Sequence, residues 1–324
     1  MSLIPPLMAD GMSYHYPMLS LTLAWNIFTL FIIMAMGFAL VKTGIAKPEH
    51  SHGVSLLSLY IVSPCMIISA FQVELTDDLR AGFMLSCLAA VIVQATYNLV
   101  CFLLKRPLGL TAVERASVTY SNAGNLIIPL VVSLLGSEWV IYCTPFIFVQ
   151  NAFLWSVGKS TLQGKTTVDW RQIVLSPNMI ATYVGGLLFL LQIELPGPLG
   201  SAVSSVGSMI GPLAMLLTGL IMGGIKASDL VRFRRLPIPV LLRLVALPLL
   251  ALGAMKLLLL ANLAPDASNI LLITLLGAAA PAASTVNQMA NIYGNDAGYA
   301  SIINVVTTLL CIITMPLIVA VYLL

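Results

Sequence analysis

The sequence predicts an all-α integral membrane protein with ten transmembrane helices. We expect two inverted five-helix repeats, in which the fourth and ninth helices are broken and cross each other. Three observations predict this fold class: the composition, ten recurring apolar runs, and a weak internal repeat. Only 8% of the 324 residues are charged and the mean hydropathy is +1.01, whereas a soluble domain carries about 25% charged residues.

Ten apolar runs have roughly the 20 residues that a helix needs to cross a bilayer. The connections between them are too short to fold as a soluble domain. The runs lie at about 20–41, 52–72, 82–104, 114–135, 138–158, 178–195, 204–225, 237–260, 269–292 and 297–322.

The basic residues sit in short connections between the spans, so the net charge of +3 indicates no nucleic-acid partner. Positive residues remain on the cytoplasmic side of a membrane. Here they concentrate after the first, third, fifth and seventh spans: Lys42, Lys47, Lys105, Arg106, Arg115, Lys159, Lys165, Arg171, Lys226, Arg232, Arg234 and Arg235. We therefore expect a multi-pass protein of the cell membrane with both termini on the external side.

Landmarks of the first five spans recur in the last five. The pairs are Gly37 with Gly185, Ser63-Pro64 with Gly211-Pro212, and Gly136 with Gly294. This repetition predicts two domains, residues 1–176 and 177–324. Because five is an odd number of spans, the second half enters the membrane from the opposite face, as in many secondary transporters.

The fourth span contains the polar stretch "YSNAGNLIIPL" from Tyr120 to Leu130. Pro129 has no N–H group, and its ring frees the carbonyl of residue 125 from the helical ladder. The residues around this break are Ser121, Asn122, Gly124 and Asn125. Irregular backbone at membrane depth is tolerated only against protein or a water-filled cavity, so the stretch predicts a substrate site.

The ninth span has a matching feature in "LLGAAAPAASTVNQMA", where Pro281 frees the carbonyl of Gly277. Ala282 and Asn287 follow the break. Two interrupted helices at corresponding places indicate a transport site, and their half-helix N-termini would attract an anion. The alternative is that the prolines only kink their helices and the asparagines only bond neighbouring helices.

Two further polar residues are candidates for the site. Arg243 lies near the start of the eighth span, where it would either attract an anion, pair with a helix C-terminus, or snorkel to the cytoplasmic surface. Asn151 follows Gln150 inside the apolar fifth span, where both would face the crossing or bond a neighbouring helix.

The twelve acidic residues and three histidines all fall in connections or near span ends. Catalysis or a metal site would need such groups inside the spans, so we expect no enzyme activity, no metal and no cofactor. Proton coupling through a buried acid is disfavoured for the same reason. A sodium ion held by backbone and side-chain oxygens is left open, as is transport of the anion alone.

The sequence resembles the auxin efflux carrier family, which includes bacterial malonate and malate permeases. The resemblance covers essentially the whole chain. It rests on Asn122 followed seven residues later by Pro129-Leu130, on "GPLAMLLTGLIMG", and on "AAAPAAS…MANIYGNDAGYASIINVVTTLLCIITMPL". It implies a permease for a small organic anion that works by alternating access, with Asn122 holding the substrate carboxylate at the crossing. It also implies a homodimer in the membrane lipid, a scaffold of the first, second, sixth and seventh helices, and transport helices third to fifth and eighth to tenth.

Two other functions are compatible with the sequence. One is a sodium-coupled organic-anion symporter of the bile-acid symporter type, although "AAPAASTVNQ" lacks the glutamate of that family's sodium motif. The other is a membrane sensor that binds without transporting. The sequence does not distinguish malate, malonate and an auxin-like acid, nor does it reveal the direction of net transport or the coupling ion.

Overall fold

The computed structural model describes residues 28–29, 32–72, 77–164, 175, 177–224 and 234–324. Every regular element in this part of the chain is a helix. Within these described ranges, five helices are long and apolar enough to cross a membrane. They run over Asp77–Leu104, Glu138–Gln163, Gly197–Gly223, Pro237–Leu260 and Ala297–Leu323. The chain is therefore an all-helical, multi-pass membrane protein.

The remaining apolar helices are shorter or are divided into segments. After the helix Ile32–Lys42, the first half contains α2 (His50–Leu57), η1 (Ser58–Val62), α3 (Ser63–Ala70), α4 (Asp77–Leu104), α5 (Ala112–Thr119), α6 (Ala123–Leu134), η2 (Ser137–Cys143), α7 (Thr144–Phe153), η3 (Leu154–Gly158) and α8 (Lys159–Gln163). The second half contains α10 (Pro177–Leu190), α11 (Gly197–Gly207), α12 (Ile210–Gly223), α14 (Pro237–Leu241), η4 (Leu242–Ala246), α15 (Leu247–Leu260), α16 (Ala267–Ala279), α17 (Ser284–Ile292) and α18 (Ala297–Leu323).

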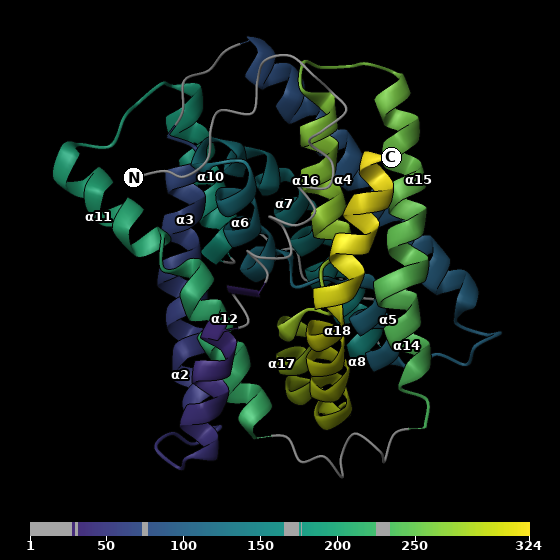
Figure 1. Ribbon diagram of the computed structural model, residues 1–324. Coiled ribbons are helices and arrows are strands. Elements are labelled where there is room, and N and C mark those ends of the chain that lie inside the picture. Colours follow the sequence, from purple (N-terminus) through teal and green to yellow (C-terminus); the bar gives the residue numbers. More distant parts are fainter. Residues whose placement is uncertain (1–27, 30–31, 73–76, 165–174, 176, 225–233) are drawn as a thin grey trace.

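The helices form two groups that lie side by side in Figure 1. The first group comprises the helix 32–42, α2, η1, α3, α10, α11 and α12, in which α3 packs against α10 and α11 and α2 packs against α12. The second group comprises α4 to α8 and α14 to α18, in which α4 contacts α7 and α16, and α17 contacts α18. Each group takes helices from both halves of the chain.

Close helix packing in the first group depends on glycines. A Cβ at Gly219 of α12 would overlap the carbonyl of Met34, and one at Gly37 would overlap the carbonyl of Leu216. The helix 32–42 and α12 therefore touch backbone to backbone, as small residues permit in membrane proteins. In the same group the ring of Phe71 packs directly over Gly185 of α10.

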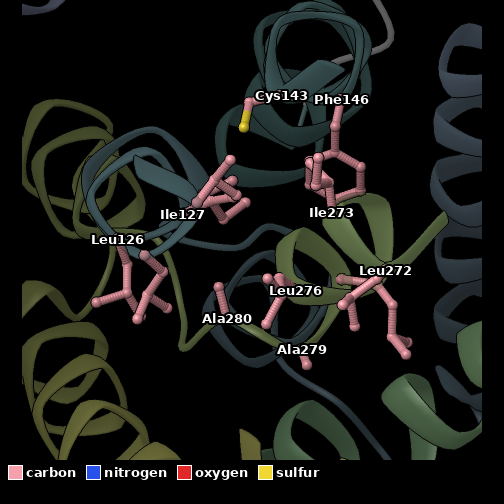
Figure 2. Packing of buried hydrophobic residues seen from close by; sticks show 14 of the residues in the cluster. Leu126, Ile127, Cys143, Phe146, Leu272, Ile273, Leu276, Ala279 and Ala280 are labelled. Carbon is pink, nitrogen blue, oxygen red and sulfur yellow. The ribbon is translucent and has the colours of Figure 1, made fainter. Parts of the chain in front are cut away.

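The centre of the second group is an apolar core between α6, η2, α7 and α16 (Figure 2). Ile127, Phe146 and Leu276 contribute side chains that are almost fully buried. A Cβ on Gly277 would lie 2.8 Å from atoms of both Ile127 and Phe146, so only glycine lets α16 approach this closely. The core fixes α16 against α6 and α7 next to the end of α16.

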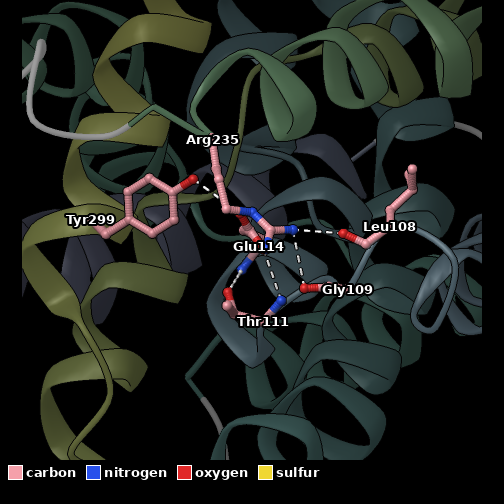
Figure 3. A network of polar contacts seen from close by, with 6 residues as sticks. All are labelled: Leu108, Gly109, Thr111, Glu114, Arg235 and Tyr299. Atoms are coloured by element: carbon pink, nitrogen blue, oxygen red, sulfur yellow. Dashed lines mark hydrogen bonds and ion pairs between the residues drawn. The ribbon is translucent and has the colours of Figure 1, made fainter.

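A polar network ties three elements of the second group together at the start of α5 (Figure 3). Glu114, whose side chain is 0% exposed, closes a capping box with Thr111. The hydroxyl of Tyr299 on α18 donates to Glu114 Oε1 at 3.0 Å, and Arg235 Nε lies 3.6 Å from the same oxygen. Arg235 also donates to the carbonyl of Leu108 at 2.6 Å. The buried carboxylate of Glu114 thus links α5 to α18 and to the residues just before α14.

We predict that Glu114→Gln lowers the free energy of unfolding by about 1–3 kcal/mol, because the amide cannot match both the cation and the two donors around it. The measurement is the thermal unfolding midpoint of the purified protein in detergent. Glu138→Gln is the control, since Glu138 is exposed and its neutralisation should leave the midpoint unchanged. Equal midpoints for the two variants would contradict the role assigned to Glu114.

Candidate functional site

Two helices are interrupted and meet at the same place. α5 ends at Thr119 and α6 begins at Ala123, while α16 ends at Ala279 and α17 begins at Ser284. In Figure 1, α16 and α6 lie in the upper half and α5 and α17 in the lower half. The two connecting segments therefore run past each other in the middle of the molecule.

The segments are joined by backbone hydrogen bonds around an isolated antiparallel bridge between Ser121 and Ala282. The N–H of Asn122 donates to the carbonyl of Pro281 at 2.8 Å, and the N–H of Ala283 donates to the carbonyl of Tyr120 at 3.0 Å. We call residues 120–122 and 280–283 the crossing. It satisfies backbone groups that the helix ends would otherwise leave without partners inside an apolar protein.

The first interruption does not lie where the sequence predicts it. α6 runs from Ala123 to Leu134 and continues through Pro129. The absent proline N–H costs this helix only its bond to the carbonyl of residue 125. The chain instead leaves the helix at residues 120–122, where the second segment supplies backbone partners. The other interruption, at 280–283, does include its proline, Pro281.

Gln150 of α7 holds the first segment of the crossing. Its Oε1 accepts hydrogen bonds from Ser121 N at 3.0 Å and from Ser121 Oγ at 2.6 Å. Its Nε2 donates to Ser121 O at 2.8 Å. One side chain therefore bonds both the N–H and the C=O group of Ser121. The bridge itself leaves these two groups unpaired, because its hydrogen bonds are made by the neighbouring residues.

Two side chains of α18 hold the second segment in the same way. The N–H of Ala282 donates to Thr307 Oγ1 at 3.1 Å, and Asn304 Nδ2 donates to the carbonyl of Ala282. Side chains of α18 thus form hydrogen bonds with both backbone groups of Ala282, just as a side chain of α7 does with both backbone groups of Ser121. The two bridge residues have equivalent support from two different helices.

Arg243 lies in η4, and its side chain is 0% exposed. Its Nε donates to Ala280 O at 2.8 Å, one terminal nitrogen donates to Val118 O at 3.0 Å, and the other donates to Ala278 O at 2.6 Å. The interpretation that Arg243 snorkels to the surface is therefore wrong. The guanidinium lies where α5 and α16 end, because three carbonyls there offer the partners that a buried cation requires.

A small cavity of about 80 Å³ lies beside the crossing. The first residues of α6 and α17 border it, so the N-terminal ends of both helices face the same space. All the described side chains that line it are neutral: Ser58, Ser63, Ser121, Asn122, Gly124, Ile147, Gln150, Asn151, Leu154, Asn178, Leu217, Ala283, Ser284 and Thr285.

Two polar atoms at this cavity have no hydrogen-bond partner. They are the hydroxyl of Ser58, a residue only 4% exposed, and Oδ1 of Asn178. Buried polar groups in proteins are nearly always paired, and each exception calls for an explanation. A polar ligand in the cavity would provide the missing partner for Ser58 and Asn178.

The structure places the residues that the sequence assigns to the site in different locations. Ser121, Asn122, Gly124 and Asn151 line the cavity. Pro281 and Ala282 belong to the crossing, but they do not line the cavity.

Two assigned side chains lie elsewhere, and two more fall outside the described part of the structure. Arg243 lies behind the crossing, and Asn287 of α17 is half-buried, does not line the cavity, and has an unpaired Oδ1. The side chains of Asn125 and Pro129 lie outside the described part of the structure.

Sequence reasoning missed the contribution of the first group of helices to this cavity. Ser58 begins η1 and Asn178 is the second residue of α10. A serine inside an apolar span and an asparagine at the start of another were the available signals. Neither signal indicates which cavity a side chain faces, because that depends on how the two groups pack.

A protein-family model described as membrane transport protein matches residues 23–167 and 161–319 of the chain. Together these ranges cover well over half of the sequence. No curated protein matches the chain.

We predict that Gln150→Leu destabilises the protein by about 1–3 kcal/mol for each backbone group of Ser121 that it leaves unpaired. The matched control is Gln94→Leu, since Gln94 is 1% exposed and both of its amide atoms lack partners. The control should be neutral or stabilising. Thermal unfolding midpoints of both variants in detergent provide the measurement, and a loss no larger for Gln150→Leu than for Gln94→Leu would refute the clamping role.

Proposed function

The chain belongs to the auxin efflux carrier-like family of membrane transport proteins, and from this premise we propose that it is a secondary transporter for a small organic anion. The substrate is a mono- or dicarboxylate, such as malonate, malate or an auxin-like acid. It crosses the cell membrane by alternating access. The protein performs no catalysis and needs no cofactor.

The observation that carries this proposal is the pair of helix N-termini at a neutral cavity. Each helix N-terminus carries the equivalent of about half a positive charge and presents N–H groups without intrahelical partners. α6 and α17 both begin at the cavity, and the described side chains that line it carry no charge. The field in this space therefore favours an anion. The lining also includes serine hydroxyls and asparagine amides, which are groups that can bind carboxylate oxygens.

The size of the cavity favours the smaller of the proposed substrates. About 80 Å³ is room for roughly six water molecules by the usual measure. A short aliphatic acid such as malonate or malate is compatible with this volume. An auxin-like acid adds an aromatic ring system, so the walls would have to move apart to accept it. We therefore propose the short dicarboxylates as the preferred substrates.

We propose that the helices form ten spans in two inverted repeats, residues 1–176 and 177–324. The equivalent support of Ser121 from α7 and of Ala282 from α18 favours this arrangement. The glycines paired by sequence also have related roles. Gly136 and Gly294 both have positive φ angles, of 111° and 69°, just after α6 and α17.

Gly37 and Gly185 provide a second pair, since each is a point of close approach between two helices of the first group. On this proposal the first group is the scaffold and the second group is the transport bundle. Two copies associate through their scaffolds in the lipid, and both termini face the external side.

We predict that labelled malonate or malate enters proteoliposomes when the interior is made positive, without a sodium gradient. A dianion gains about 4.6 kcal/mol from 100 mV, twice the single-charge value. The measurement is initial uptake with and without the imposed potential, in sodium and in potassium buffers. Uptake that requires sodium would contradict transport of the anion alone and favour the sodium-coupled symporter. Binding without uptake would favour a membrane sensor.

We predict that Asn122→Ala lowers uptake by about tenfold or more, because the substrate loses a charge-assisted hydrogen bond. The backbone bond from Asn122 N to Pro281 O remains possible in this variant. Asn287→Ala is the matched control, since Asn287 lies outside the cavity lining and should retain uptake. Normal transport by a folded Asn122→Ala protein would contradict the assignment of the cavity as the transport site, but it would not alter the family assignment.

A further inference from the structure

A second cavity, of about 100 Å³, lies between α4, α5 and the η3–α8 segment, apart from the crossing cavity. Its walls combine polar and apolar side chains. Those that matter here are Asn98 and Phe102 from α4, Arg115 and Thr119 from α5, Val157 from η3 and Thr161 from α8. Among the residues that the structure describes, the crossing cavity is lined by no cation, whereas this one is lined by Arg115.

One nitrogen of the Arg115 guanidinium has no hydrogen-bond partner in the described part of the chain. That nitrogen is Nε, which is buried. Arg235 and Arg243, by contrast, each donate to backbone carbonyls. A buried donor without an acceptor is costly, and the cost is greater for a charged group. The cavity therefore lacks an acceptor of negative charge next to Arg115.

The rim of this cavity is apolar and exposed. Phe102 and Val157, which line it, are 67% and 42% exposed. On the same side of α4, Leu99 and Leu103 are 58% and 61% exposed. In a membrane-spanning chain such a surface contacts lipid rather than water. The opening thus leads from Arg115 to the acyl-chain region and not only to the aqueous phase.

Basic residues extend the cavity toward the membrane surface. Asn98 and Phe102 lie four residues apart on one face of α4, and Lys105 and Arg106 come directly after the helix ends at Leu104. Lys105 and Arg106 are exposed. They lie in a connection that the charge pattern assigns to the cytoplasmic side, where anionic lipids attract juxtamembrane cations.

We propose that this cavity binds one anionic phospholipid, with its phosphate on Arg115. The phosphate oxygens accept from the guanidinium, the hydroxyl of Thr161 contributes from the opposite wall, and an acyl chain lies over Phe102 and Val157. Arginine suits this task because its planar fork matches phosphate oxygens. The lipid would connect α4, α5 and α8, and so brace the second group from its outer side.

The test uses the full-length protein purified in a neutral detergent. It is mixed with equal amounts of phosphatidylglycerol and phosphatidylcholine of identical acyl chains, and retained lipid is counted by native mass spectrometry. We expect one phosphatidylglycerol per chain to be retained in preference to phosphatidylcholine. In Arg115→Gln this preference should fall by about tenfold, as expected for the loss of a charge-assisted bond.

Arg80→Gln is the matched control, because Arg80 lies near the opposite end of α4 and its side chain is 65% exposed. It should retain the wild-type preference. Thr161→Leu provides a second variant that fills the cavity without altering Arg115, and it should also lose the lipid. This variant keeps the test decisive if Arg115→Gln fails to fold.

Three results would overturn the proposal. They are equal retention of the two lipids by the wild-type protein, equal loss of preference in Arg80→Gln and Arg115→Gln, and an unchanged preference in Thr161→Leu. Inorganic phosphate is added in a parallel arm. Displacement of phosphatidylglycerol by phosphate at a matching concentration would identify the ligand as a soluble anion rather than a lipid.

Discussion

The requirement that every backbone N–H and C=O group be paired inside an apolar protein governs the centre of this structure. Two helices stop there, and each end leaves groups that lipid cannot satisfy. The crossing resolves this with a bridge between Ser121 and Ala282. A single bridge pairs only part of the backbone, so Gln150, Asn304 and Thr307 supply the rest from α7 and α18. These side chains are therefore as necessary to the fold as the apolar core beside them.

The same arrangement separates the charges of the helix ends. The carbonyl ends of α5 and α16 carry partial negative charge, and Arg243 binds Val118 O, Ala278 O and Ala280 O there. The positive ends of α6 and α17 remain directed at the cavity, and the side chains described around it are neutral. On the proposed function, a site built in this way attracts an anion without a fixed cation. This suits a carrier, because a substrate held by dipoles and neutral hydrogen bonds can be released again.

The sequence predicted the membrane class and the family. It misplaced the first interruption at Pro129, because proline is a local signal whereas the partners of residues 120–122 lie about 160 residues further along the chain. It left snorkelling open for Arg243 because position along a helix does not reveal the carbonyls of two other helices. Glu114 was missed because a carboxylate near a helix end is ordinarily exposed, and only the packing of α5 against α18 buries it. Composition and local pattern were sufficient for the membrane class and the family, but the hydrogen-bond partners of these residues depended on tertiary contacts.

The distribution of hydrogen bonds also bears on how a transport cycle would proceed. Gln150, Arg243, Asn304 and Thr307, which hold the crossing, all belong to the second group of helices. The opposite wall of the cavity comes from the first group, and there Ser58 Oγ and Asn178 Oδ1 have no partners. The crossing could therefore move with the second group as one body, because neither Ser58 Oγ nor Asn178 Oδ1 has a hydrogen bond to break. Motion along this boundary would open the cavity while leaving the backbone pairing of the crossing intact. This supports alternating access by rigid-body movement rather than by refolding of the interrupted helices.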